Sequence, residues 1–318
     1  MTVAPERVDR FRRDLAGIWS DADSSDARLG LAVSGGGDSL ALLLLAHAVL
    51  RDRIAVATVD HGLRKESAAE AASVAELCAA MGVPHEVLPV TVEAGNVQDR
   101  ARAVRYEALA GWCRRHGLWA LATAHQLDDQ AETLVMRLNR GSGLAGLAGV
   151  RARGVVRGSD LLVLRPLLGW RRSELAEVVA GAGLEPAHDP SNDDLRFERI
   201  RVRTALADAD WLDPLGLARS AAMLGEAEAY LTERIDDAFL QRVALTEGEA
   251  RLTPGRSEFE ALELAGRIIA RFGGAASRSD LAALVARLRR GDNASLGGVL
   301  VRLVKGNWVF TPEPPRNV

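Results

Sequence analysis

The sequence predicts an α/β protein with a doubly wound, mostly parallel sheet, followed by a helical extension and a small C-terminal α+β unit. One observation is that short apolar runs alternate with longer helical periods through the first half of the chain, the order that βαβ crossovers produce. A second is that a glycine-rich turn at residues 34–39 separates the first apolar run from its helix. A third is that helical periods dominate after Pro186.

The apolar runs predict the strands of the sheet. They lie at residues 29–33, 53–59, 85–90, 118–122 and 161–164. The periods between and after them predict helices at residues 39–50, 66–81, 97–116, 128–140 and 171–181. Helices of this length join parallel neighbours and cover both faces of a sheet. We expect the strand order to begin 3-2-1-4.

The second half of the chain predicts a helical region and then a small mixed unit. Helical periods run from residue 198 to 243, with a break at Asp213-Pro214. The acidic stretch at 246–256 is punctuated by glycine and is interpreted as a linker. Helices are expected near 259–272 and 279–290, and the tail at 297–310 has the pattern of a hairpin. We therefore expect a catalytic domain at 1–210, a helical connector at 211–245 and a C-terminal domain at 246–318.

Composition and length narrow the class of protein. The chain has 318 residues, 48% hydrophobic and 26% charged, which is typical of a folded globular protein. Its two cysteines, Cys78 and Cys113, have no CxxC or other metal-ligand spacing, so we expect neither a disulfide scaffold nor a metal cluster. The longest apolar run, at 40–50, is too short to span a bilayer, and no secretory signal is recognisable. We expect no membrane association and a cytoplasmic location.

Charge is distributed unevenly along the chain, although the net charge is only −3. Residues 137–172 contain eight arginines and one acid, whereas residues 205–264 contain thirteen acids and five arginines. The basic stretch could form a face for a polyanion or an ordinary solvated surface. Charge alone leaves both interpretations open. The obvious aromatic side chain in this stretch for stacking a base is Trp170.

The glycine-rich turn has the features of a phosphate-binding loop. It reads Ser34-Gly35-Gly36-Gly37-Asp38-Ser39 and precedes a helix. Glycines let the backbone approach a phosphate closely, and the helix N-terminus favours an anion. Asp38 would repel phosphate unless a cation lay between them, which suggests Mg²⁺ bound by Asp38. The turn is neither a Walker A sequence nor GxGxxG. It matches the SGGxDS signature of ATP pyrophosphatases.

Two further segments follow strand ends on the same side of the predicted sheet. Val59-Asp60-His61-Gly62-Leu63-Arg64 could bring Asp60 and His61 to adenine or ribose, or could be an ordinary polar turn. The segment at 122–133, ATAHQLDDQAET, leads from a strand into a helix. Asp129 and Glu132 are three residues apart there and share one helical face. They could hold a cation, but acidic residues are also common in the first turn of a helix, where they cap it and bind no ligand.

Together these segments resemble the tRNA(Ile)-lysidine synthetase family of the PP-loop superfamily, whose catalytic fold is adenine nucleotide α-hydrolase-like. The resemblance covers residues 29 to about 205. It is carried by the segments 34–39, 59–64, 96–98, 100–102, 105–106, 122–133, 140–144, 146–147, 165–168 and 189–192, with Phe197, Arg199, Arg201 and Arg203. Beyond residue 215 it is looser.

The resemblance implies a two-step reaction with ATP and Mg²⁺. ATP would adenylate the C2 oxygen of the wobble cytidine in tRNA(Ile) with a CAU anticodon, and the ε-amine of free L-lysine would then displace AMP to give lysidine. Asp38 and Mg²⁺ would hold the departing pyrophosphate, and Arg105 would neutralise charge at the α-phosphate. Asp129 and Glu132, with His125, would hold the lysine.

The resemblance also suggests residues for RNA binding. We expect Arg151, Arg153 and Arg157 to contact tRNA phosphates, with Arg199, Arg201 and Arg203 as the next candidates. Such contacts make binding depend on salt.

Three other functions remain possible at this point. A tRNA thiolase would share the ATP loop but typically uses a cysteine nucleophile or a CxxC-bound cluster. An ammonia-using synthetase of the NAD or GMP type would share the loop, but not the segments at 122–133 and 189–192. A non-catalytic nucleotide-binding module would leave Asp38, the acidic pair and the arginine clusters without a role.

Overall fold

The computed structural model describes residues 3–60, 65–91, 97–156, 158–187 and 194–313. The chain divides into two compact units, Met1–Gly225 and Glu226–Val318. The division falls inside a single long helix, α9 (Pro214–Arg242). None of the helices in the described ranges is both long enough and apolar enough to cross a bilayer.

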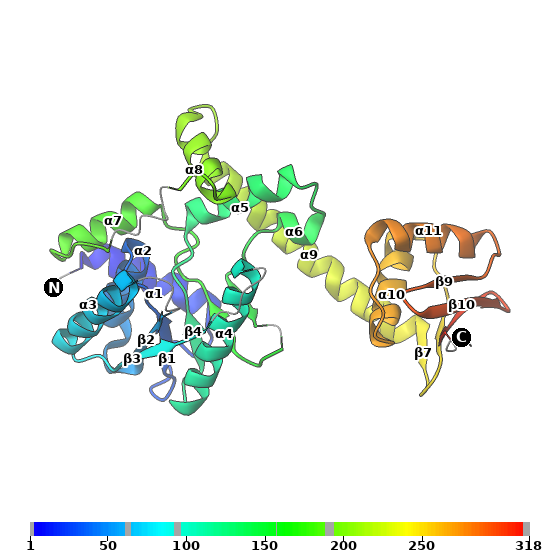
Figure 1. The fold of residues 1–318 in the computed structure, drawn as a ribbon, viewed down its shortest axis with the longest axis horizontal. Helices are drawn as coiled ribbons and strands as arrows, with labels where there is room; N and C mark the ends of the chain where they lie inside the picture. The colour runs from blue at the N-terminus through cyan, green and yellow to red at the C-terminus, as the bar shows by residue number, and fades with distance from the viewer. Residues whose placement is uncertain (1–2, 61–64, 92–96, 157, 188–193, 314–318) are drawn as a thin grey trace. The chain divides into compact units, whose positions relative to one another are not determined.

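A mostly parallel sheet forms the centre of the first unit, as predicted (Figure 1). Its strands are β1 (Leu29–Ala32), β2 (Ile54–Asp60), β3 (His85–Pro89), β4 (Ala120–Ala122), β5 (Arg153–Val155) and β6 (Leu162–Leu164). Their order, β3-β2-β1-β4-β6-β5, begins as expected. Only β5 among them runs antiparallel to its neighbour, β6. The sequence did not predict β5, because three residues that include a charged arginine carry little apolar signal.

Helices cover both faces of this sheet. Those that pack on it are α1 (Pro5–Ile18), α2 (Gly37–Leu50), α3 (Lys65–Met81), α4 (Val97–Arg115) and α7 (Arg172–Gly181). The same unit also contains α5 (Leu127–Asn139), α6 (Leu144–Leu147), α8 (Glu198–Asp208) and a short 3₁₀ turn at Arg51–Arg53. One core packs α1, α2, α3 and α7 against the sheet. The other is built on α4. The alternating side chains of β2 divide between the cores, since Ile54 and Val56 join the first and Ala55 and Ala57 the second.

Helix α1 was not predicted from the sequence, and its packing explains why. It begins with a proline at its first position and buries only Phe11 and Leu15, so its apolar face is narrow. Helix α2 is the opposite case. Residues 40–46 are all buried, which accounts for the long apolar run in the sequence.

The second unit contains an antiparallel sheet, two further helices and the C-terminal part of α9, which contributes Ile235 and Ala238 to its core. Its strands are β7 (Val243–Leu245), β8 (Ala250–Leu252), β9 (Ala294–Leu296), β10 (Val299–Val304) and β11 (Asn307–Pro312), in the order β7-β8-β11-β10-β9. The helices are α10 (Glu258–Arg271) and α11 (Arg278–Arg289). The predicted hairpin is confirmed, because β10 and β11 pair from Val299↔Pro312 to Val304↔Asn307.

The prediction of a linker at residues 246–256 is wrong. β7 and β8 form a hairpin whose turn is closed by a hydrogen bond from the Thr246 amide to the Glu249 carbonyl oxygen, at 2.8 Å. Ala250 and Leu252 are fully buried in the core of the second unit, whereas Arg251 between them is exposed. A strand of three residues with one charged member has too short a period to recognise beside an acidic turn.

Candidate active site

A cleft of about 960 Å³ opens beside the phosphate-binding loop of the first unit. Its walls come from the loop after β1, the segment after β4, the N-terminal turn of α5, and parts of α4, α7 and α8. The cleft therefore lies where a parallel sheet places its ligands, at the carboxyl ends of neighbouring strands.

The phosphate loop is held in one conformation by its own hydroxyl groups. Gly35 has a φ of +89°, which favours glycine, and its carbonyl oxygen accepts a hydrogen bond from the Ala187 amide at 3.1 Å. Ser39 Oγ donates to the Gly36 carbonyl oxygen at 2.8 Å, and the Ser34 amide donates to Ser39 Oγ at 3.2 Å. The first turn of α2 therefore points its amides at the cleft, in a form suited to phosphate.

Asp38 stands at the second position of α2 and faces the cleft. Its carboxylate lies 3.9 Å from Arg172 Nε. Burial raises the pKa of Asp38 to about 6; the positive charge of Arg172 opposes the rise, and the Asp129 carboxylate adds to it. A cation at this carboxylate would offset the cost of burying its charge. Mg²⁺ usually takes one or two carboxylates together with substrate phosphates, so Asp38 suits that ion.

Asp129 combines the two roles that the sequence left open. Its Oδ2 accepts a hydrogen bond from the Gln126 amide at 3.1 Å, which completes a capping box at the start of α5. Its Oδ1 lies 3.0 Å from Arg199 Nη2 and 3.5 Å from Arg172 Nη2. Burial raises the pKa of Asp129 above its usual range, although Arg199 opposes the shift. Asp129 is thus a helix cap and also a cleft carboxylate.

Glu132 lies one turn further along α5 and is almost completely buried. Three arginines surround it: Arg199 Nε at 2.6 Å, Arg203 Nε at 2.8 Å and Arg172 Nη2 at 3.2 Å. Burial alone would raise the pKa of Glu132, but the hydrogen bonds from Arg203 and Arg199 outweigh it and hold the pKa below its usual range. Both of its oxygens are therefore occupied by guanidinium groups.

His125 and Arg105 also line the cleft. Burial, followed by the charges of Arg165 and Arg102, lowers the pKa of His125 to about 3, so its ring is neutral near pH 7. Its Nδ1 lies 2.9 Å from Thr123 Oγ1. Arg105 has no hydrogen bond or ion pair within the described ranges, and burial lowers its pKa. An arginine keeps its proton even so, and this one is free to meet an anion.

The remaining residues predicted for the site lie in different places. Asp60 ends β2, where its carbonyl oxygen accepts from the Val90 amide, and it does not line the cleft. Arg201 donates to the carbonyl oxygens of Leu195 and Arg196. His61, Arg157 and the segment 189–192 fall outside the described residues.

The arginines predicted for RNA binding separate into two groups. Arg199 and Arg203 are ion-paired in the cleft, as described above, whereas Arg151 and Arg153 lie near β5 and β6. Arg153 belongs to β5, the strand that the sequence did not predict.

The sequence did not predict one cleft residue, Arg172, or the residue that caps α5, Gln126, and one aromatic candidate was wrong. Arg172 reaches Asp38, Asp129 and Glu132, but in the sequence it was only one arginine of a basic stretch. Gln126 caps α5 and has a buried Nε2 without a hydrogen-bond partner among the described residues. Trp170 is fully buried, and its Nε1 donates to Asp14 Oδ2 at 2.8 Å, so it cannot stack on a base.

Comparison with known proteins agrees with this geometry. Residues 8–209 match the family model of the PP-loop domain. A tRNA(Ile)-lysidine synthase of Novosphingobium aromaticivorans is 48% identical over 311 residues, 96% of this chain and 94% of that protein. The chain belongs to the tRNA(Ile)-lysidine synthase family. A relative of the same name from Zymomonas mobilis is 45% identical over 222 residues, covering 69% of this chain and 67% of that protein.

One solved structure shows the same fold in another family. It is a U34-tRNA thiolase of Methanococcus maripaludis with a [4Fe-4S] cluster, 17% identical, with a TM-score of 0.57, covering 70% of this chain and 78% of that one. In the present family member Cys78 and Cys113 are both buried, and burial raises their pKa values to about 11 and about 12. Both thiols are therefore protonated at neutral pH.

Proposed function

We propose that this member of the family uses ATP to join free L-lysine to C2 of the wobble cytidine in a tRNA(Ile) with a CAU anticodon, in the cytoplasm. The observation that carries the proposal is that one cleft is lined by both an anion-binding loop and the carboxylate of Asp129, whose neighbour Glu132 shares its arginine partners. Arg172 contacts the carboxylates of both parts. The cleft can therefore hold the phosphates of ATP and the amine of lysine close to each other.

In the first step the cytidine C2 oxygen bonds to the α-phosphorus of ATP, and the bond to the bridging oxygen of pyrophosphate breaks. The loop amides hold the phosphates. Asp38 would hold Mg²⁺, which supplies charge neutralisation for the departing pyrophosphate. Arg105, which has no carboxylate partner in the described part of the chain, meets the charge that develops at the α-phosphate.

In the second step the ε-amine of lysine bonds to C2, and the bond from C2 to oxygen breaks to release AMP. Asp129 is the better placed of the two acids to receive the ammonium group, because it lines the cleft whereas both Glu132 oxygens are paired. Its raised pKa also makes it the stronger base for the proton that the amine loses. The neutral His125 ring adds a polar contact without a competing positive charge. Glu132 would act chiefly by fixing Arg172, Arg199 and Arg203.

The arginines beyond the cleft supply RNA binding in this proposal. Arg151, Arg153 and Arg157 would contact tRNA phosphates, with Arg201 beside them. We assign Arg199 and Arg203 instead to holding Asp129 and Glu132, because their guanidinium groups already contact these carboxylates.

The test is incubation of the purified protein with ATP, Mg²⁺, labelled lysine and a CAU-anticodon tRNA transcript. We expect label to enter the RNA, with one AMP and one pyrophosphate released for each lysine incorporated. A transcript with a UAU anticodon, which lacks the wobble cytidine, is the control. AMP formation without label in the RNA would contradict the proposal, and so would equal labelling of both transcripts.

A further inference from the structure

The side chain of Arg172 occupies the place in the cleft where a substrate cation is expected. Its Nη2 lies 3.5 Å from Asp129 Oδ1 and 3.2 Å from Glu132 Oε1, while its Nε lies 3.9 Å from Asp38 Oδ2. Asp129 Oδ1 also meets Arg199, and Asp129 Oδ2 accepts from the Gln126 amide. In the empty cleft the carboxylate assigned to the ammonium group of lysine is therefore already surrounded by the protein's own donors.

The empty cleft carries more positive than negative charge among its described residues. Four arginines and two carboxylates line it, and the buried Glu132 beside them adds a third carboxylate. The lining residues are Arg105, Arg172, Arg199, Arg203, Asp38 and Asp129. One positive charge remains in excess even when all three acids are ionised. Like charges repel and a cleft attracts ions of the opposite sign, so the empty cleft favours ATP over the ammonium group of lysine.

Arg172 is held less tightly than the other two arginines around Glu132. Within the described ranges its side chain donates one hydrogen bond, to Glu132 Oε1 at 3.2 Å. Arg199 donates to Glu132 Oε2 at 2.6 Å and to Asp129 Oδ1 at 3.0 Å, and Arg203 donates to Glu132 Oε1 at 2.8 Å. Shorter charge-assisted hydrogen bonds are the stronger ones. If Arg172 left, each Glu132 oxygen would keep a guanidinium partner, and Asp129 would lose one of its two.

The backbone of Arg172 is fixed, whereas its side chain already lies beside the phosphate loop. Arg172 is the first residue of α7, and its amide donates to Asp128 Oδ2 at 2.8 Å. The acid that its Nε approaches, Asp38, is the second residue of α2 and directly follows the glycines of the loop. An exchange of partners from Asp129 to a bound phosphate therefore requires a rotation of the side chain and no movement of α7.

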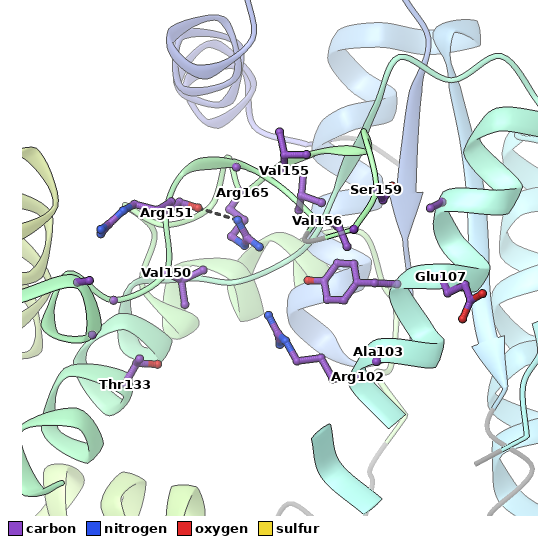
Figure 2. Close-up of a pocket in the computed structure, with 18 of the residues that line it drawn as sticks. Arg102, Ala103, Glu107, Thr133, Val150, Arg151, Val155, Val156, Ser159 and Arg165 are labelled. Atoms are coloured by element: carbon purple, nitrogen blue, oxygen red, sulfur yellow. Dashed lines mark hydrogen bonds between the residues drawn. The ribbon is translucent and has the colours of Figure 1, made fainter. Parts of the chain in front are cut away.

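The arginines next to the cleft are not placed for this exchange. Arg165 Nη1 donates to the Arg151 carbonyl oxygen at 2.8 Å, and Arg165 and Arg102 face a separate recess (Figure 2). Arg105 lines the cleft but has no ion pair within the described ranges. Arg172 contacts both the acid of the phosphate loop and the acid assigned to lysine.

We propose that Arg172 makes lysine binding depend on ATP. Its guanidinium group fills the cation site at Asp129 while the cleft is empty, and it turns to the phosphates when ATP binds, which frees Asp129 for the ammonium group of lysine. This rests on ATP and lysine being the substrates, as in the proposed function. ATP binds first, because its negative charge also offsets the positive excess of the cleft. Each substrate then raises the affinity for the other, since coupling between two ligands is reciprocal.

The test is isothermal titration of lysine into the protein with and without saturating α,β-methylene-ATP and Mg²⁺, in the absence of RNA. This analogue has a carbon atom in place of the bridging oxygen at which ATP is cleaved. We expect it to tighten lysine binding by roughly 5- to 150-fold in the wild type, the usual range for coupled sites. Arg172→Gln should remove most of this coupling by tightening lysine binding in the absence of the analogue. Arg172→Lys keeps the positive charge and should retain part of the coupling.

Arg171→Gln is the matched control. Arg171 precedes Arg172 in the chain and contacts Asp128 and Asp213, but it does not line the cleft. This variant should keep the full coupling, and thermal unfolding checks that each variant is folded. Loss of coupling in Arg171→Gln equal to that in Arg172→Gln would overturn the inference, and so would full coupling in Arg172→Gln.

The wild-type titration decides the inference even if Arg172→Gln does not fold. Equal lysine affinities with and without the analogue, or no lysine binding in either condition, would overturn it. These outcomes are separate from that of the labelled-lysine assay. Lysine incorporation without coupling would refute the inference and keep the proposed function, whereas coupling without label in the RNA would support the inference and refute the proposed RNA target.

Discussion

At the scale of single residues, one arginine links the parts of the candidate active site. Arg172 lies within 3.9 Å of Asp38, 3.5 Å of Asp129 and 3.2 Å of Glu132. Arg199 is also ion-paired with Asp129 and Glu132, and Arg203 with Glu132. Each acid therefore has a different environment, which raises the pKa of Asp38 and Asp129 and lowers that of Glu132. Carboxylates whose pKa values are shifted in different directions are suited to different roles in binding and proton transfer.

Replacement of Asp38 by alanine should abolish pyrophosphate release, because Mg²⁺ loses its protein ligand beside the phosphates. Binding of tRNA should be nearly unchanged, since Asp38 lines the cleft whereas Arg151 and Arg153 do not. Pyrophosphate release and filter binding of tRNA measure the two effects. Near-normal release by Asp38→Ala at millimolar Mg²⁺ would refute the assigned role.

Asp129→Asn should weaken lysine binding while ATP binding persists. The change removes a charge-assisted hydrogen bond worth roughly 1.5–3 kcal/mol, which corresponds to about a 10- to 150-fold rise in the dissociation constant. Isothermal titration of lysine measures it, with Glu177→Gln, at an exposed position of α7, as the charge-matched control. If Asp129→Asn and the control bind lysine equally well, Asp129 is not a lysine ligand.

Glu132→Gln should act mainly on stability. The pKa of Glu132 is held below its ordinary value of 4.5, so its ionised form stabilises the fold above that pH. This contribution is lost as the pH falls through the lowered pKa. Removing one member of a buried ion-pair cluster costs about 3–5 kcal/mol. Urea unfolding at pH 7 and below pH 4 tests this: the difference between wild type and variant should shrink in acid. A difference independent of pH would show that packing alone is responsible.

At the scale of elements, the segment between β6 and α7 joins three helices. The Trp170 carbonyl oxygen accepts from the Leu127 amide at the start of α5, at 2.9 Å. The Trp170 ring packs against Arg10 of α1, with 4.2 Å between the guanidinium carbon and the ring centroid. Asp128 Oδ2 accepts from the Arg172 amide at the start of α7, at 2.8 Å. The N-termini of α5 and α7, which carry the cleft acids and Arg172, are therefore fixed relative to each other.

Trp170→Phe should destabilise the first unit without changing RNA affinity. The variant loses the hydrogen bond from Nε1 to Asp14, worth about 1–3 kcal/mol, and keeps most of the buried ring. Urea unfolding and stem-loop RNA binding measure the two effects. A large loss of RNA affinity with unchanged stability would return Trp170 to the role of a base-stacking residue.

At the scale of the whole molecule, the two units have separate hydrophobic cores. The residues that line the cleft all belong to the first unit. The second unit has its own core around Ile268 and Phe310. Binding at the cleft should therefore stabilise one unit and not the other.

Saturation with a non-hydrolysable ATP analogue and Mg²⁺ should slow amide exchange in the first unit alone. At a ligand concentration of 100 times the dissociation constant, the core strands β1 and β4 should gain about 2.7 kcal/mol of opening free energy. The hairpin of β10 and β11 should show no change. Hydrogen exchange followed by mass spectrometry measures both. Equal protection of the hairpin would show that the units unfold as one.

The sheet, the phosphate loop and the family could be predicted from the sequence, because they depend on local patterns. Apolar runs, helical periods and the glycines of residues 34–39 act over neighbouring residues, and β1, α2 and α5 lie close to where they were predicted. Short strands such as β5 and β8 escaped prediction because three residues form no period. The pairing of charged side chains could not be predicted in this way, because it depends on the packing of distant segments. Arg172, Arg199 and Arg203 converge on Glu132 from 40 or more residues away, and Trp170 is buried against α1. Side-chain partners across such separations are set by packing, which no local pattern records.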